Sequence, residues 1–284
     1  MLGFRDYRDF ARAASEGRTL RASFLKLPAA STITTSGWWV DLSMVGRQPV
    51  AQYYAAAPLL AAQLNGMEGI FRGVDPLDGE KRLSRWWLVS PTAAFVCQFM
   101  LCDYLLFYPF VDGDSTDEQP TDNSVTLPRY TDGDGVMVMA VGQATTTGGG
   151  TFTFNYIDHD GNAQTSPVNT FSTTAANPAS ILTSQPATAG GGPFCRLASG
   201  SRGVRSITSI TNVSAPGGLF ALVLVRPLAD IAIRELSTPN EISLVELNAA
   251  PRIYDGAYLN LLANVQGSIA SGSLMGHAVF NWSD

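Results

Sequence analysis

Three aspartates in the stretch DYLLFYPFVDGDSTDEQ (103–119) could do chemistry, because they stand at a spacing that suits a metal ion. Asp112, Asp114 and Asp117 follow the pattern D-x-D-x-x-D, and aspartate-rich loops supply the several oxygen ligands that calcium takes. An EF-hand loop needs glycine at its sixth position and glutamate at its twelfth, whereas this stretch has Asp117 and Asn123 there. The three aspartates are therefore weak calcium candidates. The favoured interpretation is turn chemistry, in which Asp and Ser oxygens accept bonds from nearby backbone N–H groups.

Two further acidic stretches, DGDG (132–135) and DHDGN (158–162), are also typical of turns. His159 in the second stretch could ligate a metal only with partners that the sequence does not identify. We therefore expect a solvent-exposed turn around His159.

The remaining reactive residue types follow no catalytic pattern. The chain has no G-x-S-x-G, H-E-x-x-H, P-loop or G-x-G-x-x-G motif. Cys97, Cys102 and Cys195 form no C-x-x-C pair, and His159 and His277 lie far from them in the sequence. The carboxylate pair of a glycoside hydrolase is close only in space, so an enzyme that acts on polysaccharide stays open as a minor alternative. The favoured prediction is a protein that is not an enzyme and that binds no cofactor.

Two pairs of adjacent tryptophans are candidates for a contact surface. Trp38–Trp39 and Trp86–Trp87 both stand in strand-like sequence, and neighbouring strand residues point to opposite faces. We therefore expect one Trp of each pair in the core and the other on the surface. Trp is enriched at binding hot spots, so an outward Trp is interpreted as the anchor of a subunit contact, with stacking on a sugar as the alternative.

The first element that must position such residues is a short N-terminal helix. Phe4, Tyr7, Ala11 and Ala14 recur at helical spacing, and Gly17 follows as a C-terminal cap. The helix is predicted either to dock on a neighbour or to cover a sheet. Phe4 and Tyr7 are its interface candidates.

From Leu20 onward the sequence predicts short strands joined by turns. The stretch 151–156 alternates cleanly before a turn at 158–162, and 217–233 is a long run rich in apolar residues, as in a strand covered on both sides. We predict an all-β protein of the β-sandwich or jelly-roll type, with an N-terminal helix or arm over 1–19, a sandwich over 20–132 and a second, jelly-roll-like sandwich over 133–284. A single elaborated sandwich is the alternative.

Composition favours packing against other subunits. Charged residues make up 15% of the chain, against a norm of roughly 25%, and charge is depleted at interface cores. The net charge is −6 and the arginines are scattered, which argues against direct nucleic-acid binding.

The apolar segment 86–111 is interrupted by Pro91, Gln98, Asp103 and Pro109, so a buried sheet is expected there and no membrane contact. The N-terminal residues lack the pattern of a signal peptide, and the cysteine usage is that of a protein folded in a reducing cytoplasm.

Several phrases of the sequence carry a resemblance to a known class of protein. They are FLKLP (24–28), GWWVDLSMVGRQPVAQYY (37–54), LCDYLLFYPFVDGDSTDEQ (101–119), VTLPRYTDGDGV (125–136) and DGAYLNLLANVQGSIASGSLMGHAVFNW (255–282). With these phrases the chain resembles virion structural proteins of tailed bacteriophages, of the capsid decoration, cement or minor head kind. The resemblance covers most of the chain and is weakest in the Ser/Thr-rich middle.

The resemblance implies a function without chemistry. It implies a cement or decoration protein that stabilises a phage head, with the major capsid protein and copies of itself, in a homotrimer, as partners. It also implies a place on the capsid surface of a virion assembled in the bacterial host cytoplasm. The alternative is a tail, fibre or baseplate component that binds host-surface glycan.

Overall fold

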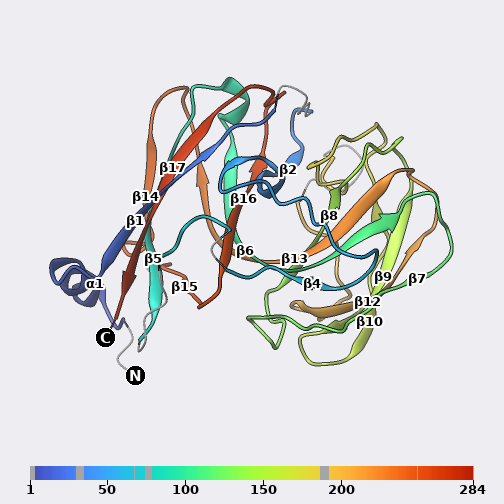
Figure 1. Cartoon of the computed structure of the whole chain (residues 1–284), viewed down its shortest axis with the longest axis horizontal. Helices are drawn as coiled ribbons and strands as arrows, with labels where there is room; N and C mark the ends of the chain where they lie inside the picture. Colours follow the sequence, from blue (N-terminus) through green and yellow to red (C-terminus); the bar gives the residue numbers. More distant parts are fainter. Residues whose placement is uncertain are drawn as a thin grey trace.

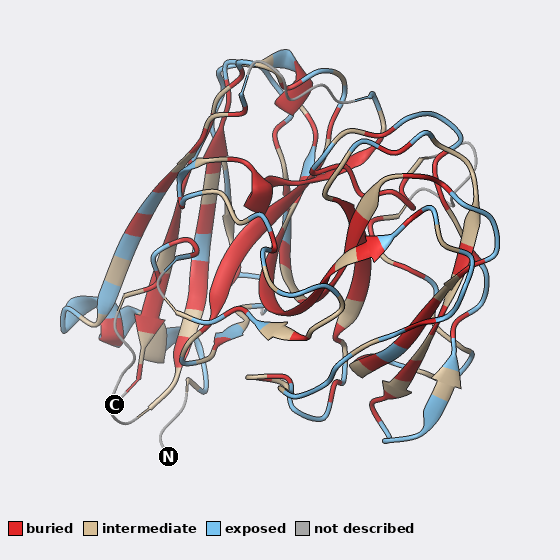
Figure 2. Ribbon diagram, turned by 45° about the vertical axis from the view of Figure 1, so that its right-hand side comes forward, coloured by how far each residue is buried: buried red, intermediate tan, exposed pale blue. Residues whose placement is uncertain are grey.

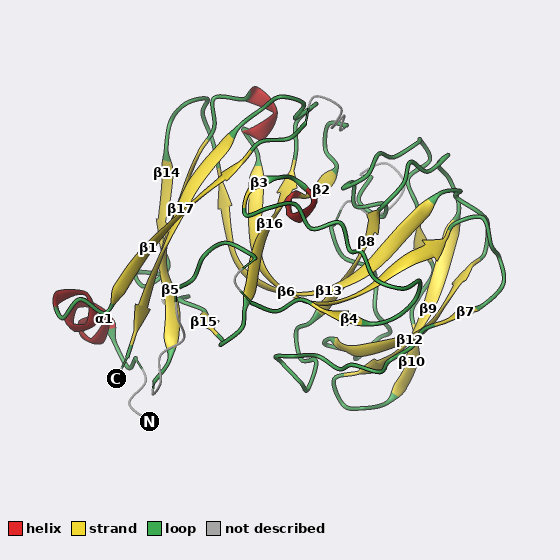
Figure 3. Cartoon of the chain, in the orientation of Figure 1, coloured by secondary structure: helices red, strands yellow, loops and turns green. Residues whose placement is uncertain are grey.

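The computed structural model describes residues 4–29, 35–66, 68–73, 79–185, 192–247 and 249–283, and strands predominate in it (Figure 3). Beside the strands stand one α-helix, α1 (Tyr7–Ser15), and two short 3-10 helices, η1 (Leu42–Met44) and η2 (Ala93–Phe95). The predicted all-β class with a short N-terminal helix is confirmed.

The strands form three antiparallel sheets, which we name by their position (Figure 1). The terminal sheet contains the first and last strands of the chain, in the order β14 (Asn240–Ser243), β5 (Lys81–Val89), β17 (Leu274–Trp282), β1 (Thr19–Lys26) and β3 (Arg47–Gln48), with β15 (Arg252–Ile253) beside β5. The central sheet has the order β2 (Trp39–Asp41), β16 (Tyr258–Asn264), β6 (Gln98–Asp112), β13 (Leu219–Ala232) and β8 (Met137–Gly142), with β4 (Ala62–Gln63) beside β6. The distal sheet has the order β10 (Ala163–Thr165), β9 (Thr151–Asp158), β12 (Val204–Asn212) and β7 (Gln119–Pro120), with β11 (Asn169–Thr170) beside β9.

The central sheet is buried on both faces, because each outer sheet packs against one of them (Figure 2). Phe24 and Trp86 of the terminal sheet share a core with Phe99 of β6. Phe154 of the distal sheet shares a second core with Leu224 of β13. Each Å² of apolar area removed from water in these cores contributes roughly 25 cal/mol. Continuous apolar runs such as β13 result from this arrangement, since both of their faces are covered.

The sheets do not divide at the boundary predicted between residues 132 and 133. In the terminal sheet Thr19 of β1 pairs with Asn281 of β17, and in the central sheet Tyr108 of β6 pairs with Leu222 of β13. The distal sheet pairs β7 with β12 in the same way. The DGDG stretch marks a local turn, in which Gly133 N–H donates to the Tyr130 carbonyl. Pairing between strands that are distant in sequence sets the architecture, and a turn signal cannot report it.

Helix α1 ends just before the predicted cap Gly17, but it begins at Tyr7, so Phe4, which the periodicity places on the helix, lies before it. Asp6 caps its N-terminus by accepting from Arg8 N–H at 2.8 Å, and Gly17 follows its C-terminus at φ +76°. Its packing differs from the prediction, because Ala13 is the buried residue while Tyr7, Ala11 and Ala14 are exposed. The helix lies against the end of the terminal sheet beside β17 (Figure 1).

Candidate functional site

The outer face of the terminal sheet collects side chains that the core does not use. Strand register places Ser23, His277, Trp87 and Glu241 in one row across β1, β17, β5 and β14. The next row holds Arg21, Val279, Arg85 and Ser243. Residues between these rows on β1, such as Phe24, point inward to the core. Period-2 alternation therefore puts aromatic, basic and hydroxyl groups together on one solvent-facing surface.

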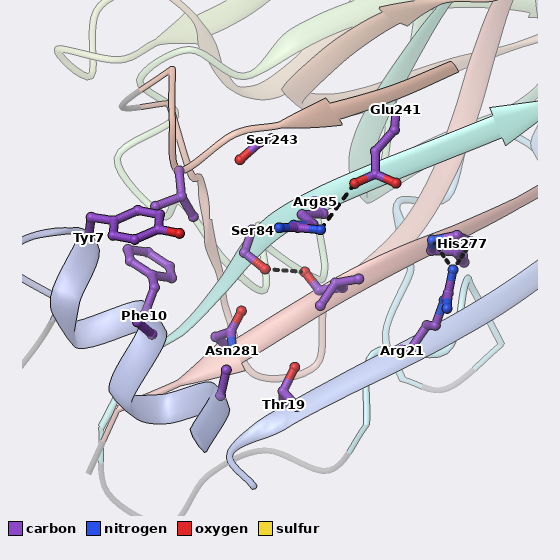
Figure 4. Close-up of a pocket in the computed structure, with 14 residues that line it drawn as sticks. Tyr7, Phe10, Thr19, Arg21, Ser84, Arg85, Glu241, Ser243, His277 and Asn281 are labelled. Atoms are coloured by element: carbon purple, nitrogen blue, oxygen red, sulfur yellow. Dashed lines mark hydrogen bonds and ion pairs between the residues drawn. The ribbon is translucent and has the colours of Figure 1, made fainter. Parts of the chain in front are cut away.

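His277 lies in the middle of this surface and is held by two neighbours, Trp87 and Arg21, of which Figure 4 shows Arg21. Its ring stacks on Trp87 with centroids 4.8 Å apart and an interplanar angle of 17°. A guanidinium nitrogen of Arg21 lies 2.7 Å from Nε2. Burial and the nearby Arg21 lower the pKa of His277, while Glu241 opposes this shift. The neutral ring accepts from Arg21, because a guanidinium can only donate.

The two arginines of this face differ in their partners. Arg85 forms a single ion pair with Glu241 at 3.3 Å, and both side chains are exposed, so the pair contributes little energy. Arg21 makes no ion pair within the described part of the chain. Since a guanidinium has five N–H donors and His277 accepts from one nitrogen, Arg21 retains bonding capacity toward solvent.

A hollow of about 360 Å³ opens between α1 and this face (Figure 4). Helix residues form one wall and strand residues of the outer face form the floor. The lining includes Tyr7, Phe10, Thr19, Arg21, Arg85, Glu241, His277 and Asn281. The helix face that the sequence predicts as apolar thus borders an open hollow instead of the core.

Two more hollows continue along the same face. One of about 580 Å³ shares His277 with the first hollow and is also lined by Trp87, Met275 and Arg47. Another, of about 290 Å³, shares Arg47 with the second and reaches Val50 and Phe71. We call these three adjoining hollows the terminal-sheet groove. Large apolar side chains stand exposed along it: Tyr7 (60%), Met275 (44%), Val50 (63%) and Phe71 (42%).

The structure separates the tryptophan candidates into core and surface. Trp86 is fully buried and Trp87 is half-buried on the outer face, as the alternation predicts. Trp38 and Trp39 are both buried, so the expectation of one outward Trp is wrong for this pair. Trp38 belongs to the core under the distal sheet and Trp39 to the core under the terminal sheet. Trp38 and Trp39 do point to opposite faces of their strand, but both faces are covered. Of the four tryptophan candidates, only Trp87 is accessible to a partner.

Phe4 and Tyr7 both lie at the helix end of the groove. The Phe4 ring stacks on Phe10 at 4.1 Å, and its backbone N–H donates to Glu80 Oε1 at 2.8 Å. Both residues border a small hollow of about 100 Å³ beside α1. Of the six interface candidates, the structure gathers Phe4, Tyr7 and Trp87 around one face.

The aspartates of the opening stretch form a defined turn at the opposite end of the molecule. Asp112 Oδ1 accepts from Asp114 N–H at 2.9 Å, and Ser115 Oγ accepts from Asp117 N–H at 3.2 Å. These bonds confirm the predicted turn chemistry. The side chains of Asp112, Asp114 and Asp117 are exposed. Across the described ranges, no group of three or more His, Cys, Asp or Glu side chains is arranged to hold a metal ion.

The turn around His159 is confirmed, but its exposure to solvent is not. Asp158 Oδ1 accepts from Asp160 N–H at 3.0 Å and from Asn162 N–H at 2.8 Å. Asp158 and His159 are both buried, and His159 Nδ1 accepts from Arg202 N–H at 3.3 Å. The loop that contains Arg202 folds over the histidine, and the sequence gives no sign of this contact.

Two polar networks are sealed inside the molecule, and sequence reasoning missed them. Asp41 is fully buried and accepts from Ser43 Oγ at 2.8 Å, from Tyr104 OH at 2.7 Å and from Tyr54 OH. Burial raises the pKa of Asp41, and these hydrogen bonds oppose the shift. These bonds tie β2, η1 and β6 together inside the molecule, out of reach of water.

A buried ion pair links the central sheet to the segment before β8. Asp103 and Arg129 are both buried and form a bidentate contact at 2.8 and 2.9 Å. Burial raises the pKa of Asp103, and Arg129 opposes the shift. No sequence pattern joins these two residues, since one lies in a strand and the other in a loop.

Both lysines of the chain are buried as well. Lys26 Nζ donates to the Val45 carbonyl at 3.0 Å, and Lys81 Nζ donates to the Arg72 carbonyl at 2.9 Å. Burial lowers the pKa of Lys26 to about 7, while Asp41 opposes the shift. The cations on the described surface are therefore arginines.

The three cysteines are buried and free of disulfides. Burial raises the pKa of each thiol above its ordinary value. Thiolates are the reactive form of cysteine, so these side chains serve packing.

Comparisons with protein-family models, with curated proteins and with solved structures found no match. In the described residues, none of the helices has the length and apolar character to cross a membrane.

Proposed function

We propose that this chain is a non-enzymatic virion structural protein of a tailed bacteriophage. It acts as a cement or decoration subunit on the head surface, bound to the major capsid protein and to its own copies, in a trimer. One observation carries the proposal, namely the terminal-sheet groove with exposed Tyr7, Met275, Val50 and Phe71. Contiguous exposed apolar side chains rimmed by polar ones mark protein contact surfaces.

The placement of the ionisable groups supports this proposal. Asp41 and Asp103 are fully buried and hydrogen-bonded to their partners, so these carboxylates stabilise the fold. The groove instead carries aromatic, methionine and arginine side chains, the types that are enriched at protein interfaces. Its apolar part suits an attachment that tolerates salt, because burial of apolar area is not screened by ions. Repetition by symmetry multiplies weak contacts into a stable attachment.

Binding to phage heads tests the proposal. The full chain is mixed with purified empty heads that lack it, and its cosedimentation is measured at low and high salt. We expect Met275→Asp and Phe71→Asp to weaken binding by about tenfold or more, while Val168→Asp, at an exposed apolar residue of the distal end, binds as the wild type does. Absence of wild-type binding, or equal loss in the Val168 control, contradicts the proposal.

A second candidate function is a tail, fibre or baseplate protein that binds host-surface glycan. It is favoured by the half-buried Trp87 and by the hydroxyl and amide groups of Thr19 and Asn281 in the hollow beside α1. Electron microscopy of virions that carry a label on this chain separates the two functions. Label over the shell supports cement, and label at the tail tip supports adhesion.

A further inference from the structure

The terminal-sheet groove has an excess of basic side chains. Arg21, Arg47 and Arg85 line it, with the acids Glu241 and Glu68 beside them. Arg85 is paired with Glu241, whereas Arg21 and Arg47 make no ion pair within the described ranges. The chain as a whole is acidic, with net charge −6, so this basic groove stands out against its surroundings.

A loop at the opposite end has the complementary charge. Asp112, Asp114, Asp117 and Glu118 are all exposed and crowd a short turn between β6 and β7. None of the four forms an ion pair with a described residue. Like charges held close together repel, so a cation that a partner supplies stabilises this loop.

The acidic loop is held rigidly by the residues behind it. Gln119 binds both backbone groups of Asp112, at 2.9 Å each. Asn212 Nδ2 donates to the carbonyls of Asp112 and Ser115, at 2.9 and 2.8 Å. Gly113 is packed so tightly that a Cβ there would lie 2.4 Å from the Gly217 carbonyl oxygen. A loop fixed in this way loses little conformational entropy on binding.

The groove and the loop cannot meet within one chain. Figure 1 shows α1 and the terminal sheet at one end of the molecule and β7 at the other. We propose that the terminal-sheet groove binds the acidic loop (112–118) of a second copy of this chain, with Arg21 and Arg47 paired to its carboxylates. Such head-to-tail contacts are heterologous, so they produce a closed ring or an open chain of subunits. Arginine suits this role because its planar donors match a carboxylate in bidentate pairs.

This inference rests on the proposed function, since it assigns one of the subunit contacts. It also predicts a salt dependence that the apolar contact with the head does not have. Charged groups separated by more than about 10 Å are screened at 0.1 M salt, and exposed pairs weaken as salt rises. Self-association is therefore expected to fall with salt, whereas attachment to heads is not.

The experiment measures the mass of the full chain by sedimentation and light scattering. Wild type is expected to form species larger than one chain at low salt and to dissociate as salt increases. The groove variant Arg21→Gln with Arg47→Gln, and the loop variant Asp114→Asn with Asp117→Asn, are each expected to be monomeric, with association weakened about tenfold or more. The control Arg234→Gln with Glu246→Gln changes exposed residues elsewhere and is expected to associate as wild type.

Mixing the two variants gives the sharper result. The groove variant keeps its acidic loop and the loop variant keeps its groove, so an equal mixture is expected to stop at species of two chains. A wild type that stays monomeric at about 100 μM in low salt, or a loop variant that associates normally, overturns the inference. If such a monomer still binds empty heads, the proposed function stands and only this contact fails; if the chains associate but bind no heads, the reverse holds.

Discussion

The terminal and distal sheets cover the central sheet in the same way but present different side chains to solvent. On the distal sheet, β9 alternates buried Phe152, Phe154 and Tyr156 with outward polar residues. There Asn155 donates to Ser209 Oγ at 2.9 Å and accepts from Thr165 Oγ1 at 2.7 Å. These groups satisfy one another across strands.

The terminal sheet leaves part of its bonding capacity unused. Arg21 contacts a neutral histidine and no carboxylate of the described chain, and Met275 and Tyr7 stand exposed nearby. Both sheets alternate buried and outward side chains. The terminal sheet, however, keeps guanidinium donors that no described carboxylate binds, whereas the polar groups named on the distal sheet bond to one another. We therefore expect a partner to bind the outer face of the terminal sheet, where apolar side chains are exposed and Arg21 has no carboxylate partner in the described chain.

The largest expected effect is a difference in stability between substitutions at two adjacent residues, one in the core and one in the groove. Trp86→Ala removes a fully buried side chain and is expected to lower the free energy of unfolding by about 3–5 kcal/mol. Trp87→Ala removes a half-buried ring on the outer face and is expected to cost about 1–2 kcal/mol. Urea denaturation of both variants gives the values. Equal losses would mean that the outer face is ordinary packing, and the contrast between the two sheets would disappear.

A second effect concerns the acidic end. Gly113→Ala is expected to lower the free energy of unfolding by about 3 kcal/mol, because its Cβ would meet the Gly217 carbonyl at 2.4 Å. Gly46→Ala is the control, since a Cβ there meets nothing within 4 Å, and its change is expected to stay within about 0.5 kcal/mol. Thermal denaturation distinguishes them. A stable Gly113→Ala protein would show that the loop is less rigid than its contacts indicate.

A third effect is the pH dependence that the buried Lys26 causes. Its pKa is lowered from 10.5 to about 7, so between these values the unfolded chain binds a proton that the folded chain does not. The free energy of unfolding then rises with pH in this window. From pH 7 to pH 9 the wild type is expected to gain about 2 kcal/mol relative to Lys26→Met. Parallel denaturation curves of the two proteins at several pH values measure this difference, and a constant difference would contradict the lowered pKa.

The smallest effect is a titration on the groove itself. The pKa of His277 lies below its ordinary value because of burial and of Arg21. Arg21→Gln removes the nearby positive charge, so the pKa of His277 is expected to rise toward its ordinary value. NMR titration of the His277 ring measures this shift, and His159, which Arg21 does not contact, serves as the internal control. An unchanged pKa would show that Arg21 does not hold the ring in its neutral form.

Local patterns of the sequence predicted local structure well. The alternation over 151–156 became β9, which forms a hairpin with β10 in which Ile157 pairs with Ala163. The apolar run predicted as a doubly covered strand became β13, between β6 and β8. Gly17 ended the helix as expected. Each of these features depends on residues within a few positions of one another.

The candidate site was much harder to predict, because distant strands build it. Arg21 and His277 meet only because β1 pairs with β17, and no sequence pattern reports that pairing. Alternation shows that Trp38 and Trp39 face opposite ways, but it does not show that a sheet covers each side. The burial of Asp158 and His159 has the same origin, since the covering loop comes from residues near Arg202.

The burial of Lys26 and Lys81 has a practical consequence. No other residue of the sequence carries an ε-amino group, and both Nζ atoms are held against backbone carbonyls in the interior. Acylating reagents and amine cross-linkers therefore find these side chains only when the native structure opens. The rate of their modification, followed by peptide mass spectrometry, would report how often the molecule opens, both free in solution and attached to a particle.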